Sequence, residues 1–213
     1  MTIARIFMKR LLILMSVCLF SFMCHAQAIQ FGIKGGLNIS KESTQVYNSE
    51  TFGTFDYNTY SRYGINIGGL VNIPTGNKFE LEVGLSYSML GYKDKIYDDS
   101  NSDGYFYAKI TSHYLTIPIA EKFYPFCNGL YIEAGPQFGF LLSKDSSLSG
   151  QYAEMSFDGN TKTFDFALLG GLGYSFSNHI FVDARYIHSL SNTSTQYEGG
   201  KNRNFQISVG YMF

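Results

Sequence analysis

The strongest constraint on this chain is a two-residue alternation of bulky apolar and small or polar side chains. In the stretch RNFQISVGYMF, every second position holds a large apolar residue: Phe205, Ile207, Val209, Tyr211 and Phe213. A period of two places these residues on one face of a β-strand. The same alternation recurs in seven earlier segments: 29–40, 62–73, 79–90, 109–123, 130–142, 164–176 and 180–188. The chain is therefore expected to be all-β, with eight strands.

The segment 109–123 departs from this alternation at two positions. Glu121 lies in the phase that is otherwise apolar, so the sequence leaves open which face the end of this strand presents. Pro118 lacks a backbone N–H, and a proline within a strand usually marks an edge or a bulge. We therefore predict a local break in the strand at Pro118.

The connections between the segments are alternately short and long. The short ones are rich in turn formers and cover residues 74–78, 124–129 and 177–179. The long ones are polar, as expected of water-facing loops, and cover residues 41–61, 91–108, 143–163 and 189–202. This alternation is typical of an eight-stranded antiparallel up-and-down transmembrane β-barrel. Ten strands would result if the longest loops paired as hairpins above the bilayer.

Several features indicate that the bulky face touches hydrocarbon while the other face lines the lumen. The polar phase holds mostly Gly, Ser, Asn and Gln, whereas the outer wall of a soluble barrel, such as a secreted lipid carrier, would carry many Lys and Glu. Charged residues are only 15% of the chain, against roughly 25% in soluble domains. Aromatic residues gather near strand ends, as interfacial girdles require: Phe79, Phe123, Tyr124, Phe164, Phe176 and Phe213. Because hydrocarbon cannot hydrogen-bond a free N–H or C=O, the first and eighth strands are expected to pair.

The first 26 residues have the layout of a secretory signal peptide. Basic residues precede the apolar run 11–23, which is too short to span a membrane comfortably, and small residues end at Ala26. Cleavage there would leave residues 27–213 as the barrel domain. Lipidation of Cys24 is the disfavoured alternative, because bulky residues precede it. Cys127 would then be the single cysteine of the mature chain, which excludes an internal disulfide.

Several stretches of the mature chain together form a recognisable pattern: FGIKGGLN in the first segment, YLTIPIAEKFYP from Tyr114, YIEAGPQFGFLL from Tyr131, and the later ALLGGLGYSF and DARYIHSL. In these stretches the chain resembles the PorT-like outer-membrane β-barrel proteins of Gram-negative bacteria. The resemblance implies the outer membrane and the barrel fold, but no single activity, because members include secretion accessories and proteins of unknown role. It also implies that the last strand, with Tyr211 and Phe213, is the signal read by the barrel-insertion machinery.

Seven charged residues fall in the lumen-facing phase: Lys34, Glu80, Glu82, Glu133, Asp165, Asp183 and Arg185. A buried charge must be paired or change its protonation state. Arg185 can fork onto two carboxylates, and Lys34 can take another. Acids outnumber bases, so we expect some carboxylates to reach water or to share a proton. Two interpretations stay open: a salt-bridge network that plugs the narrow lumen, which we favour, and a gated path for protons or ions.

A weak metal-binding motif lies in the loop that precedes the fourth segment. Asp99, Asn101 and Asp103 have the spacing of the first half of a calcium loop. The twelfth position is Ile110 and not the bidentate Glu that such loops need. We therefore expect no metal here and favour an acidic loop turn.

Three histidines prompt a search for a hydrolase in the barrel wall: His113, His179 and His188. Ser112 and Ser189 are sequence neighbours of two of them, but adjacent residues of a strand point to opposite faces. A nucleophile and its base must meet in space, with a third group orienting the base. We therefore expect no catalytic site and no cofactor.

The expected function is that of a non-enzymatic structural or interaction protein of the bacterial outer membrane. Its expected partners are outer-membrane lipid, the barrel-insertion machinery, and a protein that contacts the outer loops or the periplasmic turns. The formal net charge of −1 argues against nucleic acid as a partner. A narrow channel for small solutes is the alternative function, and a lipid-modifying enzyme is less favoured.

Overall fold

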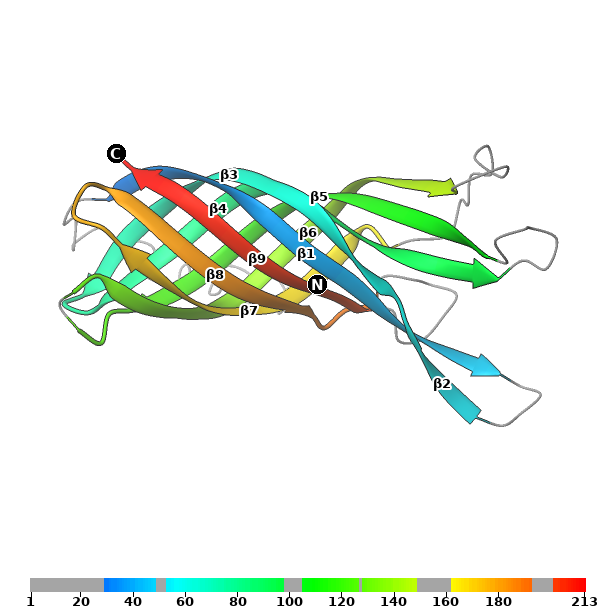
Figure 1. Ribbon diagram of the computed structural model, residues 1–213. Coiled ribbons are helices and arrows are strands. Elements are labelled where there is room, and N and C mark those ends of the chain that lie inside the picture. Colours follow the sequence, from blue (N-terminus) through cyan, green and yellow to red (C-terminus); the bar gives the residue numbers. More distant parts are fainter. Residues whose placement is uncertain (1–28, 49–52, 98–104, 127, 149–161, 193–200) are drawn as a thin grey trace, which may run out of the picture.

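The chain folds into a closed antiparallel β-barrel, shown in Figure 1. The computed structural model describes residues 29–48, 53–97, 105–126, 128–148, 162–192 and 201–213. The expected signal peptide, Cys127 and the expected calcium-loop residues Asp99, Asn101 and Asp103 lie outside these ranges. Within them, no α-helix is long and apolar enough to cross a membrane.

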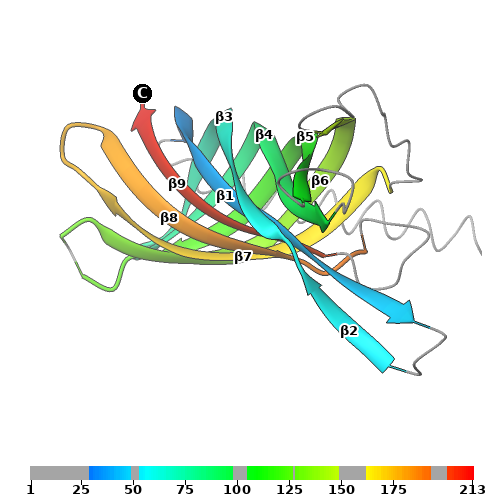
Figure 2. The same cartoon turned by 45° about the vertical axis from the view of Figure 1, so that its right-hand side comes forward.

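The last strand of the sheet pairs with the first. The strands are β1 (Gln30–Asn48), β2 (Gly53–Asn58), β3 (Tyr60–Gly76), β4 (Phe79–Tyr97), β5 (Tyr105–Phe123), β6 (Leu130–Leu148), β7 (Phe164–Ser175), β8 (Ile180–Ser189) and β9 (Lys201–Met212). β1 pairs with both β2 and β3, each strand from β3 to β8 pairs with the strand that follows it, and β9 returns to β1. β9 lies antiparallel to β1 from Gly32↔Met212 to Ser43↔Lys201, which closes the sheet. The expected pairing of the first and last barrel strands is therefore confirmed (Figures 1 and 2).

β2 and β3 are two parts of one barrel strand, so the barrel has eight strands as expected. Thr59 alone separates them, and both pair with β1. The pairs Ser40↔Arg62 and Ser43↔Asn58 leave two residues of β1 opposite three of the other strand, which is a β-bulge. The Thr59 hydroxyl donates to the backbone O of Glu42 and accepts from the backbone N of the same residue. One side chain therefore satisfies the backbone groups that the bulge takes out of the ladder.

The barrel strands are longer than the sequence predicts at one end. Three of the expected loops, 41–61, 91–108 and 143–163, contain the outer parts of β1, β2, β4, β5 and β6. β4 and β5 keep one register as far as Tyr97↔Tyr105, so polar sequence there does not end the pairing. β7, β8 and β9 are shorter, and the wall therefore stands taller on the β1–β6 side (Figures 1 and 2). We call this end the long-loop end and the opposite one the short-turn end.

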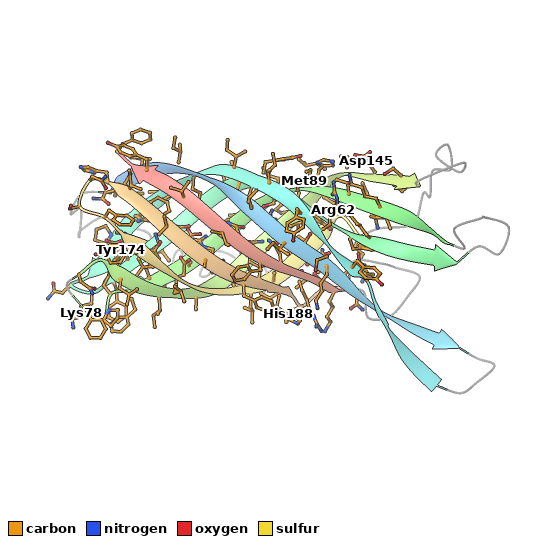
Figure 3. The ribbon with its side chains drawn as sticks, in the orientation of Figure 1. Arg62, Lys78, Met89, Asp145, Tyr174 and His188 are labelled. Carbon is orange, nitrogen blue, oxygen red and sulfur yellow. The ribbon has the colours of Figure 1, made fainter. Side chains whose placement is uncertain are left out.

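The two faces of the wall have the orientation that the alternation predicts. Large apolar side chains stand on the outside, with Phe31 60% and Tyr63 71% exposed. Small and polar side chains on the inside are buried, among them Asn38, Ser86 and Ser208. Side chains extend from both faces of the ribbon in Figure 3, where Lys78 and Tyr174 lie near the short-turn end.

The predicted local break at Pro118 is found on only one side of the strand. β5 runs through this residue, and Thr116↔Gly139, Pro118↔Gln137 and Glu121↔Ala134 keep one register with β6. On the other side, pairing with β4 lapses only opposite Ile117 and Pro118, because proline has no N–H to donate. The register shift in this strand pair lies between His113 and Tyr114 instead.

Glu121 faces outward at the short-turn end, where it is exposed. Its Oε1 accepts a hydrogen bond of 2.7 Å from the hydroxyl of Thr75, near the end of β3. A carboxylate in the apolar phase is tolerated there because the strand is about to leave the hydrocarbon.

Most of the expected girdle aromatics lie on the outside at strand ends. Near the short turns, Phe79 and Phe123 stack with their ring centroids 5.0 Å apart. Phe176 and Phe213 are also exposed at this end, and Phe164 is exposed near the long-loop end. These aromatic side chains lie where the wall passes from hydrocarbon to headgroups.

Tyr124 is the exception among the expected girdle aromatics. Its hydroxyl donates to Glu80 Oε2 over 2.9 Å, and its ring centroid lies 5.4 Å from that of Tyr131. Burial, and secondly the Glu80 carboxylate, raise the pKa of the Tyr124 hydroxyl. The hydroxyl therefore stays protonated and able to donate over the ordinary pH range.

Closure of β1 on β9 depends on a glycine that faces the lumen. A Cβ on Gly36 would lie 2.0 Å from the carbonyl oxygen of Ile207 in β9. The neighbouring Gly35 faces outward, and its Cβ would meet only the Asn66 carbonyl oxygen, at 3.7 Å.

We predict that Gly36→Ala destabilises the barrel by about 1–3 kcal/mol, because the added methyl forces the closing strands apart. Gly35→Ala, one residue away, is the matched control and should leave stability nearly unchanged. Urea unfolding in detergent micelles measures the free energy of unfolding of both variants, with the folded fraction read from the gel mobility of unheated samples. Equal stability of the two variants would contradict the close approach at Gly36.

Candidate functional site

Six charged side chains from five strands meet in the lumen. We call them the lumen cluster: Lys34 (β1), Glu82 (β4), Lys122 (β5), Glu133 (β6), Asp183 and Arg185 (β8). Each is 3% exposed or less. Three of its hydrogen bonds join residues that are 48 to 103 positions apart in the sequence, so the cluster links strands across the barrel.

The alternation of the strands and a glycine on β7 bring these side chains together. All six occupy the lumen-facing phase of their strands. In the register of the sheet, Gly171 lies between Glu133 on β6 and Arg185 on β8. A Cβ on Gly171 would lie 3.1 Å from both Arg185 Cγ and Glu133 Oε1. The absent side chain therefore leaves room for an ion pair across the intervening strand.

Arg185 binds two carboxylates with its guanidinium group. Its Nε donates to Glu133 Oε1 over 2.7 Å, and its Nη2 donates to Glu133 Oε2 over 2.9 Å. The same Nη2 lies 2.8 Å from Glu82 Oε1 and 3.3 Å from Asp183 Oδ2. A planar fork suits this two-point contact, which a lysine could not reproduce.

Glu82 is the carboxylate that all three cations share. Besides Arg185, Lys34 Nζ lies 3.1 Å from its Oε1, and Lys122 Nζ lies 2.7 Å from its Oε2. Lys34 also lies 3.8 Å from Asp183 Oδ2. The three carboxylates and three cations therefore form one connected network with no formal net charge.

Lys122 is the member that the sequence analysis missed. It shares the lumen phase of Tyr114 and Thr116, so the alternation would have found it if Glu121 had been assigned outward. Its Nζ lies 4.8 Å from the ring centroid of Tyr131 and 5.3 Å from that of Phe181. Lys122 evens the count within the cluster, although over the whole lumen the five expected acids still outnumber Lys34, Lys122 and Arg185.

Glu80 and Asp165 lie apart from the lumen cluster, although the sequence analysis grouped them with it. Glu80 Oε2 accepts from Asn72 Nδ2 over 3.3 Å and from the Tyr124 hydroxyl. Asp165, toward the long-loop end, accepts hydrogen bonds from three polar side chains: Ser189 and Ser191, each over 2.7 Å, and Asn202 over 3.3 Å. Neutral donors, and not cations, partner these two carboxylates in the described part of the chain.

Apolar side chains pack on both sides of the lumen cluster. Toward the short turns, Leu70, Phe181 and Met212 form one buried group. Toward the long-loop end, a second buried group lies in the lumen: Ala120, Ala167, Leu169 and Ile187. The charges are therefore held in a layer between two apolar layers.

The serine–histidine sequence neighbours, which were not expected to form a catalytic site, each contact other residues. Ser189 faces the lumen and donates to Asp165, whereas the His188 ring stacks on Tyr186 of the outer face with centroids 6.4 Å apart. His113 contacts the Tyr87 hydroxyl through Nδ1 and Asp145 Oδ2 through Nε2, at 3.2 Å. No hydrogen bond between Ser112 and His113 is found in the described residues, nor is any group of three metal ligands.

His179 lies in the turn between β7 and β8, with its ring centroid 5.9 Å from that of Tyr211. Tyr211 is 43% exposed and Phe213 70% exposed at the end of β9. The backbone N of Phe213 donates to the Phe31 carbonyl over 2.7 Å, which extends the pairing with β1. Both aromatics thus lie at the closing seam, and their role as an insertion signal stays a prediction.

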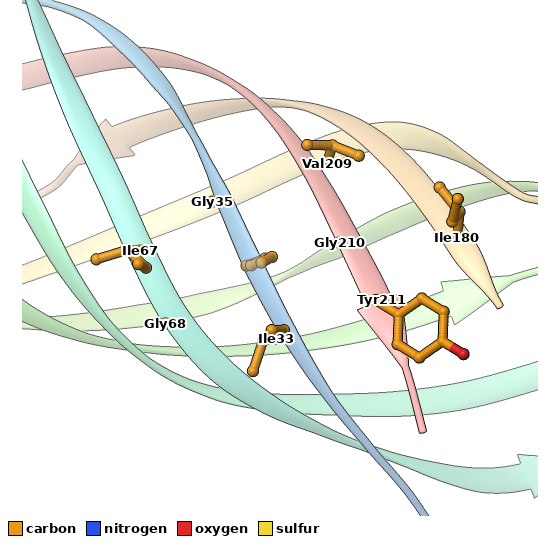
Figure 4. Close-up of a pocket in the computed structure, with 9 residues that line it drawn as sticks. Ile33, Gly35, Ile67, Gly68, Ile180, Val209, Gly210 and Tyr211 are labelled. Carbon is orange, nitrogen blue, oxygen red and sulfur yellow. The ribbon is translucent and has the colours of Figure 1, made fainter.

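A hollow of about 590 Å³ lies on the outside of the wall near the short turns. Figure 4 shows the outward side chains of Ile33, Ile67, Ile180, Val209 and Tyr211 around it. Gly35 also lines it and adds no side chain. Lys34 of the lumen cluster, Gly68 and Gly210 line it as well. The hollow therefore opens on the surface that faces lipid, and only the wall around Lys34 lies between it and the lumen cluster.

Three solved structures are similar to this chain at low identity, and the first of them supports the barrel fold. Neisserial surface protein A (NspA) is 13% identical, with a TM-score of 0.51 over 88% of this chain and 100% of that one. OprG of Pseudomonas aeruginosa is 14% identical, with a TM-score of 0.47 over 88% and 97%. Ail, the attachment invasion locus protein of Yersinia pestis, solved with the heparin analogue sucrose octasulfate, is 15% identical, with a TM-score of 0.43 over 88% and 100%.

No protein of curated function matches this sequence. Residues 25–195 match the family model described as outer membrane protein beta-barrel domain. The match covers most of the chain, and it agrees with the closed barrel, the apolar outer wall and the polar lumen. The chain therefore belongs to the outer membrane protein beta-barrel domain family, whose members lie in the outer membrane.

Proposed function

We propose that this protein is a PorT-like, non-enzymatic barrel whose lumen is closed by the lumen cluster and whose work is to bind another protein. That partner contacts either the strands that extend at the long-loop end or, as a secretion component, the periplasmic turns. The main support for a closed lumen is the contact of Arg185 with Glu133 and Glu82 across the barrel.

The pairing within the lumen cluster supports a plug and not a path. An ion that crossed this layer would have to separate buried partners, and an uncompensated buried charge is strongly unfavourable. Every charge of the cluster lies within 3.8 Å of an opposite charge. The two apolar layers beside the cluster add a barrier to hydrated ions.

The extended strands support an interaction role at the long-loop end. Among the strands of the described ranges, β2 pairs with β1 alone. The outer part of β6, from Ser143 to Leu148, pairs with β5 but lies beyond the last pair with β7, Phe140↔Phe164. Backbone groups on such edges can pair with an extended segment of another protein. A strand edge that rises into water is thus a surface on which a partner could add a strand.

The closed lumen predicts that the purified protein conducts no ions in a planar bilayer. Its current should stay at the baseline of the protein-free bilayer, because the charged layer and both apolar layers block the lumen. A general porin inserted in the same way serves as the positive control. Sustained single-channel openings of the native sequence that Arg185→Ala abolishes would favour the narrow channel for small solutes.

The network predicts a large stability cost when one partner is removed. Arg185→Ala leaves Glu82 and Glu133 buried with too few cations, and should lower the free energy of unfolding by about 3–5 kcal/mol. Glu121→Gln removes an exposed charge from the same barrel and should change it little. Urea unfolding in micelles compares the two, and a small effect of Arg185→Ala would show that the network does not hold the lumen closed.

The interaction role predicts a specific cross-linking pattern in cells. A photoreactive amino acid at Ser147, on the exposed edge of β6, should form an adduct with a partner outside the barrel. The same group at Ser177, in the turn between β7 and β8, is the matched position for a periplasmic partner. Adducts at one position only would show on which side of the membrane the partner lies. The absence of adducts at both positions would contradict the interaction role.

A further inference from the structure

Three basic side chains lie next to one another on the outer face near the long-loop end. Lys41 of β1 pairs directly with Arg203 of β9, and Arg203 pairs directly with His188 of β8. They share the outward phase of Leu37, Phe205 and Tyr186, all of which are exposed. The row therefore runs across three neighbouring strands on the side that faces the membrane.

A second like-charge pair lies farther round the same end of the barrel. Lys93 of β4 and Lys109 of β5 are directly opposite each other, and both are exposed. The β6 residue opposite Lys109 is Ser147, which brings no charge. Together, Lys41, Lys93, Lys109, His188 and Arg203 form what we call the basic belt.

These cations lack acidic partners within the described ranges. No carboxylate there forms an ion pair with Lys41, Lys93, Lys109 or Arg203, and the exposed Asp145 on β6 binds His113. The Nε of Arg203 is buried without a hydrogen-bond partner in the same ranges. Like charges directly opposite each other in an antiparallel sheet destabilise it. Two such pairs are therefore an unfavourable arrangement unless an anion bridges them.

The row of Lys41, Arg203 and His188 lies at the edge of the apolar wall. On β9 and β8, the outward positions two residues closer to the short turns are Phe205 and Tyr186, which are large and exposed. This row thus lies where the outer wall passes from hydrocarbon to the polar region of the leaflet on the long-loop side, and Lys93 and Lys109 are exposed at the same end. In outer-membrane barrels the long loops face the exterior.

We propose that the basic belt binds the phosphate groups of the anionic lipid in the outer leaflet. A phosphate bridges Lys41 and Arg203, whose guanidinium can donate two hydrogen bonds, and a second phosphate bridges Lys93 and Lys109. The acyl chains of the same lipid lie against the apolar wall below. Charge complementarity and position both select a phosphorylated lipid over a soluble partner, and the assignment does not depend on whether the lumen is closed.

Lipid binding to the intact barrel in detergent micelles tests this assignment. The probe is diphosphoryl lipid A, with zwitterionic phosphatidylethanolamine for comparison, and native mass spectrometry counts the bound lipids. Wild type should bind lipid A in preference, and added salt should weaken the binding because exposed charges are screened. The double variants Lys41→Ala/Arg203→Ala and Lys93→Ala/Lys109→Ala should each weaken lipid A binding by roughly tenfold or more. Each basic residue near an anionic membrane surface strengthens binding severalfold, and each variant loses two of them.

Lys78→Ala provides the matched control, because Lys78 is an exposed lysine at the short-turn end. It should leave lipid A binding unchanged, and Arg203→Lys should retain part of the binding that Arg203→Ala loses. Unheated gel mobility verifies that each variant is folded. Equal binding of lipid A by wild type and the variant lacking all four Lys and Arg side chains would overturn the proposal. The proposal would also be overturned if Lys78→Ala lost as much lipid A binding as the belt variants, or if wild type bound phosphatidylethanolamine as tightly as lipid A.

Discussion

The absence of any hydrogen-bonding partner in hydrocarbon is the constraint on which the structure depends. An open sheet would leave a row of backbone N–H and C=O groups facing lipid, which is strongly unfavourable. Pairing of β9 with β1 removes that edge, and the hydrogen bond from Phe213 to Phe31 carries the seam to the end of the strand. Glycine at position 36 lets the two backbones approach closely enough for this pairing.

A barrel closed from so few strands has little interior space, and the composition of the lumen follows from that. Glycines and serines occupy many inward positions, so the few long side chains can reach across to one another. Gly171 illustrates this, since it separates Glu133 from Arg185 in the sheet without separating their charged groups in space. Complete mutual pairing is what makes burial of six charges tolerable in this lumen.

The alternation predicted the number of strands, the face of each strand and the closing pair, because strand periodicity depends only on which side is buried. It did not predict where β1, β4, β5 and β6 end, since above the bilayer the sheet meets water on both faces and needs no apolar stripe. Lys122 was missed because Glu121 obscured the phase of its strand. Tyr124 was placed in the girdle because a sequence pattern cannot show that a turn folds a side chain back over the lumen. The partner could not be predicted, because a barrel wall serves many functions.

The balance of charge in the lumen cluster determines how the barrel responds to an applied voltage. Moving one elementary charge through 100 mV is worth about 2.3 kcal/mol, and this energy drives the sensors of voltage-gated channels. Three cations and three carboxylates that are held together sum to zero, so the field exerts no net pull on the layer as a whole. Raising the voltage is therefore a poor way to dislodge it, whereas neutralising one carboxylate by protonation would leave the layer with an excess positive charge.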